Sequence, residues 1–469
     1  MLPRPVVTTA LSLLHFALAA AVTVHVLRYK RNPGSSVAWI GLAWLSPVIG
    51  SFLYMLLGIN RVRRRARNML DARINPLQHA PPPGGGRDDH LAPLEFAGRR
   101  ITQRCVEAGN SLQILANGDV AYPLMLAAID SARSTIGLSS YIFRADQAGN
   151  QFIAALIRAT ERGVQVRVLI DGYGGGYLWS KTYHRLRRAG VPVARFLHSV
   201  LPWRMPFLNL RSHRKIMLVD GSVAFTGGLN IAAENLLSSQ PRYPVLDTHF
   251  KVQGPVVTQL SEAFAALWVF TTNESLSGPL WFPQLQPAGP CIARVVTSGP
   301  DQDLEKIEYL VLQAAACAQT SIQIMTPYFL PDERIITALA LAAVRGVSVD
   351  IVLPLSSNHP SVDWSTRAHI EPLLIAGCRI WTHSLPFDHS KLMSVDGIWS
   401  FVGSSNWDMR SFRLNFEINL EIYQSQIVGQ ISRIIESNQK NRLTQADLGR
   451  RSLPARLRDS AARLMLPYL

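Results

Sequence analysis

The chain has 469 residues, of which 48% are apolar and only 17% charged, and this composition excludes an intrinsically disordered protein. Its length corresponds to about three typical domains of ~150 residues, so we expect two or three folded units and exclude a small scaffold held together by disulfides. The formal net charge of +15 suits an anionic partner, either nucleic acid or an acidic membrane surface.

The cysteines argue against a structural zinc site. They are Cys105, Cys291, Cys317 and Cys378, and they lie far apart in the chain. They form neither a CxxC motif nor a Cys/His cluster with zinc-ligand spacing. We therefore expect free thiols that face a reducing compartment.

Two long apolar runs open the chain, at 5–27 and 36–59, and neither contains Lys, Arg, Asp or Glu. Each is long enough to cross ~30 Å of hydrocarbon as a helix. The alternative for the first run is a cleaved signal peptide, which the alanines at 19–21 favour but the single basic residue Arg4 and the second run oppose. We expect two transmembrane helices within residues 1–70.

The basic residues around these runs predict their orientation. The outer flanks carry the amino terminus, Arg4 and five arginines at 61–67, whereas the loop between the runs carries three basic residues, Arg28, Lys30 and Arg31. The positive-inside rule therefore places both chain ends, and the domains that follow, in the cytoplasm. The RVRRRAR run at 61–67 is expected to contact anionic lipid headgroups.

An internal repeat follows the membrane segment. The first copy joins SARSTIGLSSYIF at 131–143 to RGVQVRVLIDG at 162–172, and the second joins CAQTSIQIMTPYF at 317–329 to RGVSVDIVLP at 345–354. Each copy reads as strand, helix, strand, with a buried β-branched second strand typical of a parallel or mixed sheet. We expect an α/β fold of two similar lobes, each a mixed sheet covered by helices, that form one pseudo-symmetric unit.

The domain boundaries follow from this repeat and from composition. Residues 71–100 contain PPPGGGRDD and no periodic pattern, so they are predicted to be a Pro/Gly-rich linker. The first lobe is expected at 101–288 and the second at 289–450. The last segment, 451–469, has the spacing of a basic amphipathic helix, which would either lie on a membrane or pack on the catalytic unit.

Each lobe ends in the same polar motif, with identical spacing and with the same His, Lys, Asp, Gly and Asn. The two copies are His213, Lys215, Asp220, Gly227, Gly228 and Asn230, and His389, Lys391, Asp396, Gly403, Ser404 and Asn406. Alternate residues of a strand share one face, so the His and Lys of each copy point the same way. A single HxK pair is weak evidence of a site, but two copies that close the same repeat are not a coincidence.

The twinned motif suits phosphoryl transfer without a metal. Two such motifs placed face to face supply two imidazoles and two ammonium groups around one phosphorus atom. A neutral histidine can attack phosphorus while a protonated one gives its proton to the departing alkoxide. The lysines and asparagines would stabilise the charge on the phosphate oxygens. A phospho-histidine then accepts either water or an alcohol.

These residues resemble the phospholipase D superfamily, whose two HxK(x)4D(x)6G[GS] motifs match 213–228 and 389–404. The chain is more narrowly similar to bacterial cardiolipin synthases. This narrower similarity lies in the two apolar runs and in the segments MTPYFLPDERI and HSKLMSVDGIWSFVGSSNWDMRSFRLNFEINLEIY. The resemblance implies that two phosphatidylglycerol molecules condense to cardiolipin and glycerol through a phosphatidyl-enzyme, without metal or cofactor. It also implies a bacterial inner-membrane enzyme whose catalytic domain faces the cytoplasm.

The same resemblance implies roles for single residues. His213 is expected to be the nucleophile and His389 the general acid and then base, although the two could be exchanged, with Lys215, Lys391, Asn230 and Asn406 binding phosphate. Glu417 is expected to orient His389, and Asp247 to orient His213, each within its own lobe. Asp220 and Asp396 are expected to hold the strand-turn geometry. Ser404 would donate to the phosphate, and its counterpart is Gly228.

Other interpretations stay open at this stage. The motif determines which bond is attacked but not the acceptor, so a phospholipase D hydrolase or a transferase with another donor or acceptor alcohol is compatible with it. A nuclease suits the positive charge, but the membrane runs and the two fused lobes oppose it, and the two intact motifs oppose an inactive lipid-binding scaffold. The segment 199–210 reads either as an ordinary loop or as an interfacial wedge.

Overall fold

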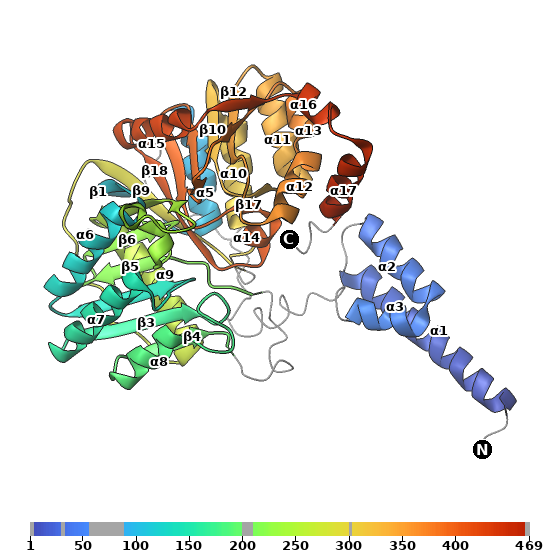
Figure 1. Cartoon of the computed structure of the whole chain (residues 1–469), viewed down its shortest axis with the longest axis horizontal. Helices are drawn as coiled ribbons and strands as arrows, with labels where there is room; N and C mark the ends of the chain where they lie inside the picture. The colour runs from blue at the N-terminus through green and yellow to red at the C-terminus, as the bar shows by residue number, and fades with distance from the viewer. Residues whose placement is uncertain (1–3, 30–32, 56–88, 199–209, 300–302, 465–469) are drawn as a thin grey trace. The chain divides into compact units, whose positions relative to one another are not determined.

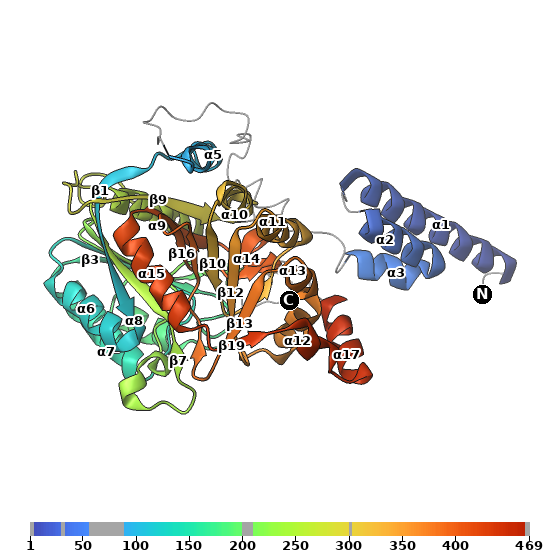
Figure 2. The same cartoon turned by 90° about the horizontal axis from the view of Figure 1, so that it is seen from above.

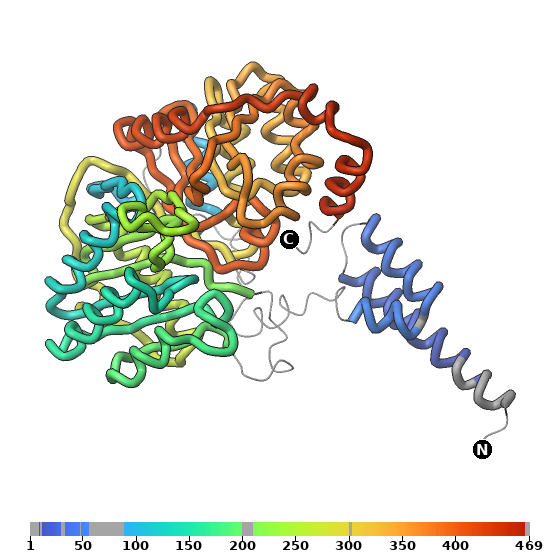
Figure 3. Tube along the Cα trace, viewed as in Figure 1, coloured from blue at the N-terminus to red at the C-terminus, as the bar shows by residue number. Residues whose placement is uncertain are grey.

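A computed structural model describes residues 4–29, 33–55, 89–198, 210–299 and 303–464 (Figures 1 and 3). It divides the chain into two compact units, Met1–Asn68 and Met69–Leu469. We name them after what the sequence leads us to expect of them, the first as the membrane unit and the second as the catalytic unit. Each is described by itself.

The membrane unit contains α1 (Arg4–Tyr29), α2 (Pro33–Leu45) and α3 (Pro47–Leu53). Among the described residues, one helix is long and apolar enough to cross a membrane, over Ser12–Tyr29 of α1. The second apolar run does not form the single continuous helix that we predicted. It divides at Ser46, whose backbone is not helical (φ −140°, ψ 80°), because Pro47 at the start of α3 has no N–H to continue the hydrogen bonding of α2.

Polar side chains join the helices of the membrane unit. The indole N–H of Trp44 in α2 donates to the hydroxyl of Thr23 in α1 over 3.1 Å. Nδ1 of His25 in α1 lies 2.7 Å from the hydroxyl of Tyr54, directly after α3. His25 is therefore explained by packing between helices, where a polar group in an apolar environment needs a partner.

The predicted α/β fold with two mixed-sheet lobes is confirmed. The first lobe has the strand order β4-β3-β2-β5-β6-β8-β1, and the second has the matching order β13-β12-β10-β15-β16-β18-β9. The strands of the first lobe are β1 (Glu107–Ala116), β2 (Thr135–Ser140), β3 (Gln165–Asp171), β4 (Val193–Phe196), β5 (Ile216–Val219), β6 (Val223–Gly227) and β8 (Thr248–Gln253).

The strands of the second lobe are β9 (Cys291–Ser298), β10 (Ser321–Met325), β12 (Ser348–Pro354), β13 (Arg379–His383), β15 (Leu392–Val395), β16 (Trp399–Gly403) and β18 (Glu417–Tyr423), with β19 (Asn441–Leu443) added at the outer edge. Antiparallel pairing of β1 with β9 joins the lobes into one 15-stranded sheet. Two short parallel pairs complete the strands: β7 (Val245–Leu246) with β14 (Phe387–Asp388), and β11 (Phe329–Leu330) with β17 (Trp407–Asp408).

Helices cover both faces of this sheet (Figures 1 and 2). In the first lobe they are α6 (Asn117–Ser131), α7 (Gln147–Glu161), α8 (Lys181–Arg188) and α9 (Val256–Thr272). In the second they are α10 (Lys306–Cys317), α11 (Glu333–Val344), α12 (Pro360–His369), α13 (Glu371–Ile375), α14 (Met409–Arg413), α15 (Ser425–Ser437) and α16 (Gln445–Gly449). Helices α9 and α15 share one hydrophobic core that runs across both lobes. The two lobes are therefore one folding unit.

The predicted linker ends earlier than we expected. Residues 71–88 lie outside the described residues, but Ala92–Thr102 form helix α5, which lies beside α10 of the second lobe (Figure 2). Leu91 and Leu94 are fully buried in the core of that lobe. The linker prediction was wrong here because the Pro/Gly-rich stretch masked the short apolar pattern that follows it.

The C-terminal segment forms helix α17 (Leu453–Leu464), which packs on α12. Asp459 is buried in this contact and pairs with Arg451 and Arg458. The guanidinium of Arg458 also lies 4.3 Å from the ring centre of Trp364 in α12. Of the two interpretations that the sequence left open, packing on the catalytic unit is the one observed.

Candidate active site

Both HxK motifs lie where the lobes meet, each directly before a central strand. His213 and Lys215 precede β5, and His389 and Lys391 precede β15. The backbone N–H of His213 donates to the carbonyl of Phe416 over 2.9 Å, and that of His389 to the carbonyl of Leu246 over 2.8 Å. Each histidine is thus fixed by a hydrogen bond to the other lobe.

The carboxylates also act across the lobes. Nδ1 of His213 lies 2.9 Å from Oε2 of Glu417, and Nδ1 of His389 lies 2.9 Å from Oδ2 of Asp247. Our expectation that each carboxylate orients the histidine of its own lobe was wrong. Glu417 begins β18 and Asp247 precedes β8, and these strands flank the central β9–β1 pair, so each carboxylate reaches the opposite histidine.

These contacts define which ring nitrogen of His213 faces the reaction. Nδ1 lies near two acceptors, the Glu417 carboxylate and the Ser404 carbonyl oxygen at 3.1 Å, so Nδ1 carries the hydrogen and donates it. The lone pair of the neutral ring is then on Nε2. Burial lowers the pKa of His213 to about 4, which keeps the ring neutral at pH 7.

The two His–carboxylate pairs hold their protons differently. Burial raises the pKa of Asp247 to about 8 and lowers that of His389, so this pair retains one proton at neutral pH. Burial also acts against ionisation of Glu417, but the facing His213 and the Ser404 hydroxyl lower its pKa. The Glu417–His213 pair therefore carries an ionised carboxylate and a neutral ring.

The two lysines give the site a buried positive charge. Nζ of Lys215 donates to the carbonyl of His213 over 3.0 Å, and Nζ of Lys391 donates to that of His389. Burial lowers the pKa of Lys215 to about 7 and that of Lys391 to about 8, partly offset by nearby carboxylates. A bound anion would stabilise both ammonium groups, so the site is suited to a phosphate.

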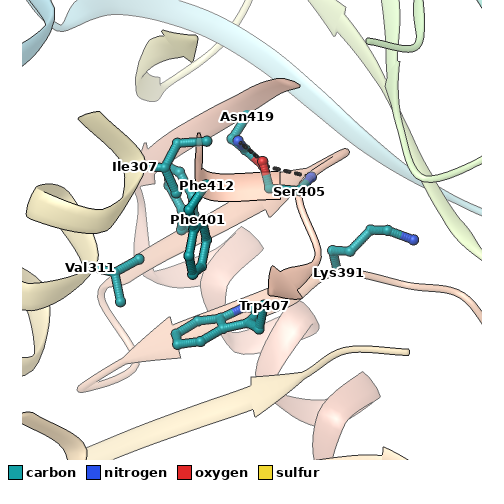
Figure 4. A pocket seen from close by; sticks show the side chains of 8 residues that line it. All are labelled: Ile307, Val311, Lys391, Phe401, Ser405, Trp407, Phe412 and Asn419. Carbon is teal, nitrogen blue, oxygen red and sulfur yellow. Dashed lines mark hydrogen bonds between the residues drawn. The ribbon is translucent and has the colours of Figure 1, made fainter. Parts of the chain in front are cut away.

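Apolar side chains direct the Lys391 ammonium towards the site. Its stem borders a small pocket lined by Phe401, Trp407 and other apolar residues, and Figure 4 shows the side chain extending away from these rings. On another wall, the Asn419 amide donates to the hydroxyl of Ser405 over 2.8 Å. The residues that line this pocket thus pack against the aliphatic part of the Lys391 side chain.

The predicted phosphate-binding residues are only partly arranged as expected. Oδ1 of Asn230 accepts the N–H of Ile142 over 3.2 Å, and within the described part of the chain its amide N–H groups are left for a ligand. Oδ1 of Asn406 is buried without a hydrogen-bond partner among the described residues. The hydroxyl of Ser404 donates to Glu417 over 2.5 Å and accepts the N–H of Ile418. We had expected this hydroxyl to donate to the phosphate, but in the structure it supports the carboxylate instead.

Close packing explains why the counterpart of Ser404 is a glycine. A Cβ at position 228 would lie 2.0 Å from Oδ1 of Asp247. A side chain there would push Asp247 away from His389. The glycine is therefore required by the carboxylate of the first lobe.

Asp220 and Asp396 lie at turns and hold strand ends. Asp220 accepts N–H groups from residues 133–135, and Asp396 accepts N–H groups from 319–321. Both have positive φ, 50° and 53°. Burial alone would raise the pKa of the Asp396 carboxyl group, but its backbone hydrogen bonds outweigh burial and lower this pKa to about 2. This arrangement agrees with the structural role that we expected for both residues.

The sequence interpretation missed four residues beside the histidines. Tyr141 packs its ring edge-on against His213, with centroids 4.9 Å apart, and its twin Tyr328 does so against His389 at 6.3 Å. Both follow the first strand of the repeat, so alignment of the two copies would have found them. Arg211 and Phe387 stand two residues before the histidines, and the ring centroid of Phe387 lies 6.1 Å from that of His389.

The comparisons with known proteins now identify the class. The family model described as "Cardiolipin synthase, PLD-like domain" matches residues 125–268 and 311–438, one segment in each lobe. The model described as "Phospholipase_D-nuclease N-terminal" matches 17–58. The solved structure of phosphatidylserine synthase from Haemophilus influenzae has a similar fold, with a TM-score of 0.58 and 14% identity, over 76% of this chain and 95% of that one.

The relatives narrow this class to one family. A cardiolipin synthase of Geobacillus kaustophilus is 32% identical over 94% of this chain and 90% of its own length. The major cardiolipin synthase ClsA of Bacillus subtilis is 30% identical over 99% of this chain and all of its own. The chain therefore belongs to the bacterial cardiolipin synthases of the phospholipase D superfamily, which makes it a phosphatidyltransferase.

Proposed function

We propose that the protein joins two phosphatidylglycerol molecules into cardiolipin and releases glycerol. The observation that carries this proposal is the pair of crossed His–carboxylate contacts at the lobe junction, beside two buried lysines. The pKa shifts of the carboxyl groups favour an ionised Glu417 in one pair and a retained proton in the other. A transfer that passes through a covalent intermediate needs such a division between a nucleophile and an acid.

In the first step, Nε2 of His213 attacks the phosphorus of the donor lipid. The bond from phosphorus to the glycerol oxygen breaks as the bond from nitrogen to phosphorus forms. The ionised Glu417 accepts the Nδ1–H of His213 and stabilises the positive charge that develops on the ring. Lys215, Lys391, Asn230 and Asn406 are the groups that we assign to the non-bridging phosphate oxygens.

The proton for the departing glycerol comes from the Asp247–His389 pair. His389 gives its Nε2–H to the glycerol oxygen while the proton held with Asp247 moves to Nδ1. The pair is then an ionised carboxylate facing a neutral ring with a free Nε2 lone pair. His389 is now a base, and it takes the proton of the terminal hydroxyl of the second phosphatidylglycerol. The new oxygen–phosphorus bond forms, and His213 leaves.

We further propose that both N-terminal runs are embedded in the bacterial cytoplasmic membrane, with the chain ends in the cytoplasm. Helix α1 has the length and the apolar character of a spanning helix. Its contacts with α2 and α3 through Thr23 and His25 make a helical hairpin, which suits a second, broken passage through the bilayer. The boundaries that we propose are an anchor at 1–70, lobes at 101–288 and 289–450, and a tail at 451–469, with α5 counted as part of the second lobe.

Lipid mass spectrometry tests the reaction. The solubilised protein is incubated with phosphatidylglycerol alone, with and without a chelator, and His213→Ala serves as the control. Cardiolipin and glycerol, formed in both conditions and lost in the variant, are the expected products. Phosphatidic acid as the sole product would make the protein a hydrolase, and no product would move the test to mixtures with phosphatidylethanolamine.

A further inference from the structure

One edge of the catalytic unit is defined by the carboxyl ends of its parallel strands. Strands β2, β3 and β4 are parallel in the first lobe, as are β10, β12 and β13 in the second. Tyr141 directly follows β2 and contacts His213, and Tyr328 follows β10 and contacts His389. The candidate active site therefore lies at this edge of the sheet, beside the segments that follow β2 and β10.

In the first lobe, the loop between β3 and α8 leaves large apolar side chains in solvent. Leu178 is 85% exposed, Trp179 62% and Tyr173 50%. The loop begins with GYGGG at 172–176. Trp179 stacks one face on His184 of α8, with ring centroids 4.1 Å apart, and still leaves most of its surface in solvent. Tyr173 also lies under Arg211, with the guanidinium carbon 3.9 Å from the ring centre, so the exposed group continues into the site.

The second lobe contributes the same kind of side chain. Leu355, directly after β12, is 53% exposed, and Leu385, in the loop after β13, is 71% exposed. Tyr243 precedes β7, which pairs with β14 next to His389, and is 70% exposed. We call these side chains the apolar rim: Tyr173, Leu178, Trp179, Tyr243, Leu355 and Leu385.

The side chains of the apolar rim indicate what kind of partner it would contact. Single exposed apolar residues are ordinary on protein surfaces, but here separate connections of both lobes bring them to the edge that holds the site. Leucine with Trp and Tyr is the mixture that enters the boundary between headgroups and acyl chains. Basic side chains accompany it, because Arg211 covers Tyr173 and Arg242 lies 5.2 Å from the ring of Tyr243.

We propose that the apolar rim is a membrane-docking surface, which lays the edge containing the active site on a bilayer with anionic lipids. Lipid headgroups then reach the two histidines while their acyl chains stay in the hydrocarbon. This inference goes beyond phosphatidyl transfer and rests on the proposed function only in taking a membrane lipid as the substrate.

A depth measurement tests docking without reference to turnover. The full chain, with its four cysteines replaced by serine, is labelled with an environment-sensitive fluorophore at Leu178→Cys or Val344→Cys. Val344 is 70% exposed but ends α11, just before β12 begins, so it marks the opposite edge. In vesicles of phosphatidylglycerol and phosphatidylethanolamine, we expect a blue shift and quenching by nitroxide lipids at 178 only. Water-like emission at both positions would overturn the proposal.

A second experiment separates docking from chemistry. The variant Leu178→Asp/Leu385→Asp is compared with Val344→Asp on long-chain vesicles and on short-chain phosphatidylglycerol dissolved as monomers. We expect the double variant alone to lose at least about tenfold in kcat/KM on vesicles, with unchanged turnover of the monomeric substrate. Equal losses on both substrates would assign the rim to folding of the site and reject docking. A wild-type protein that makes no cardiolipin would reject the proposed function, whereas the fluorescence result would stand.

Discussion

The two lobes share one strand order but differ at matched positions around the histidines. Gly228 and Asp247 of the first lobe correspond to Ser404 and Glu417 of the second. The shorter carboxylate is packed against a glycine, and the longer one receives the serine hydroxyl and, over 3.1 Å, the amide of Asn415. Glu417 therefore has more donors than Asp247, and the two sites of a symmetric backbone acquire different charges.

Such a difference would allow a duplicated fold to divide two chemical roles between its copies. With identical surroundings, the two histidines would have equal intrinsic pKa values, and nothing in the site itself would distinguish the nucleophile from the acid. Extra hydrogen bonds favour the ionised form of Glu417, whereas burial favours the protonated form of Asp247. This contrast supports our proposal that His213 is the nucleophile, and substitutions at the matched positions test it.

Removal of each histidine should have the largest effect. His213→Ala is expected to abolish turnover and covalent labelling by a radioactive phosphatidylglycerol. His389→Ala should lower turnover about 10²- to 10⁴-fold, because an acid–base group is lost, yet still form the phosphatidyl-enzyme. Intact-protein mass spectrometry measures the adduct. Equal labelling of the two variants would exchange or reject the assignment.

Neutralising the carboxylates should have unequal effects. Glu417→Gln removes the negative charge that holds the Nδ1–H of His213, and we expect kcat to fall about 10³-fold. Asp247→Asn keeps a neutral hydrogen-bonding group beside His389 but cannot pass it a proton, so we expect the acid step to weaken and kcat to fall about 10²-fold. Both variants keep side-chain volume, and their melting temperatures serve as the control for folding. A larger loss of kcat for Asp247→Asn than for Glu417→Gln would contradict the different roles that we propose for the two carboxylates.

Exchange of the small residues should disturb only one lobe severely. Gly228→Ser places a Cβ against Asp247, and overpacking of this kind costs about 1–3 kcal/mol of stability. Ser404→Ala fits the space and should raise the pKa of Glu417 by removing one hydrogen bond. Thermal unfolding and activity measure both variants. A fully stable, active Gly228→Ser protein would contradict the packing argument.

The lysines predict a modest pH dependence of substrate binding. Their pKa values of about 7 and about 8 mean that both ammonium groups lose protons as pH rises from 7 to 9, and anion binding needs the protonated form. KM should therefore rise in this window, by at most about tenfold per pH unit for each lysine. Lys391→Arg keeps its charge and should flatten the rise. A constant KM from pH 7 to 9 in the unmodified protein would contradict the prediction.

The sequence predicted the parts of the molecule that are repeated within it. The lobes and the HxK residues occur twice, so their spacing could be checked internally. The pairing of His213 with Glu417 joins residues about 200 positions apart across two lobes, and no local pattern distinguishes it from pairing within a lobe. The break between α2 and α3 at Ser46 was missed because an apolar run records hydrophobicity and not backbone continuity.

Helix α5 has a consequence for synthesis of the chain. It leaves the ribosome before the first lobe, yet Leu91 and Leu94 are buried against α10, which is made about 200 residues later. Until then these leucines have no core, and β1 lacks β9, its partner across the lobe junction. The nascent chain must therefore wait for its second half, and a product that stops early exposes an apolar helix and an open strand edge to quality control.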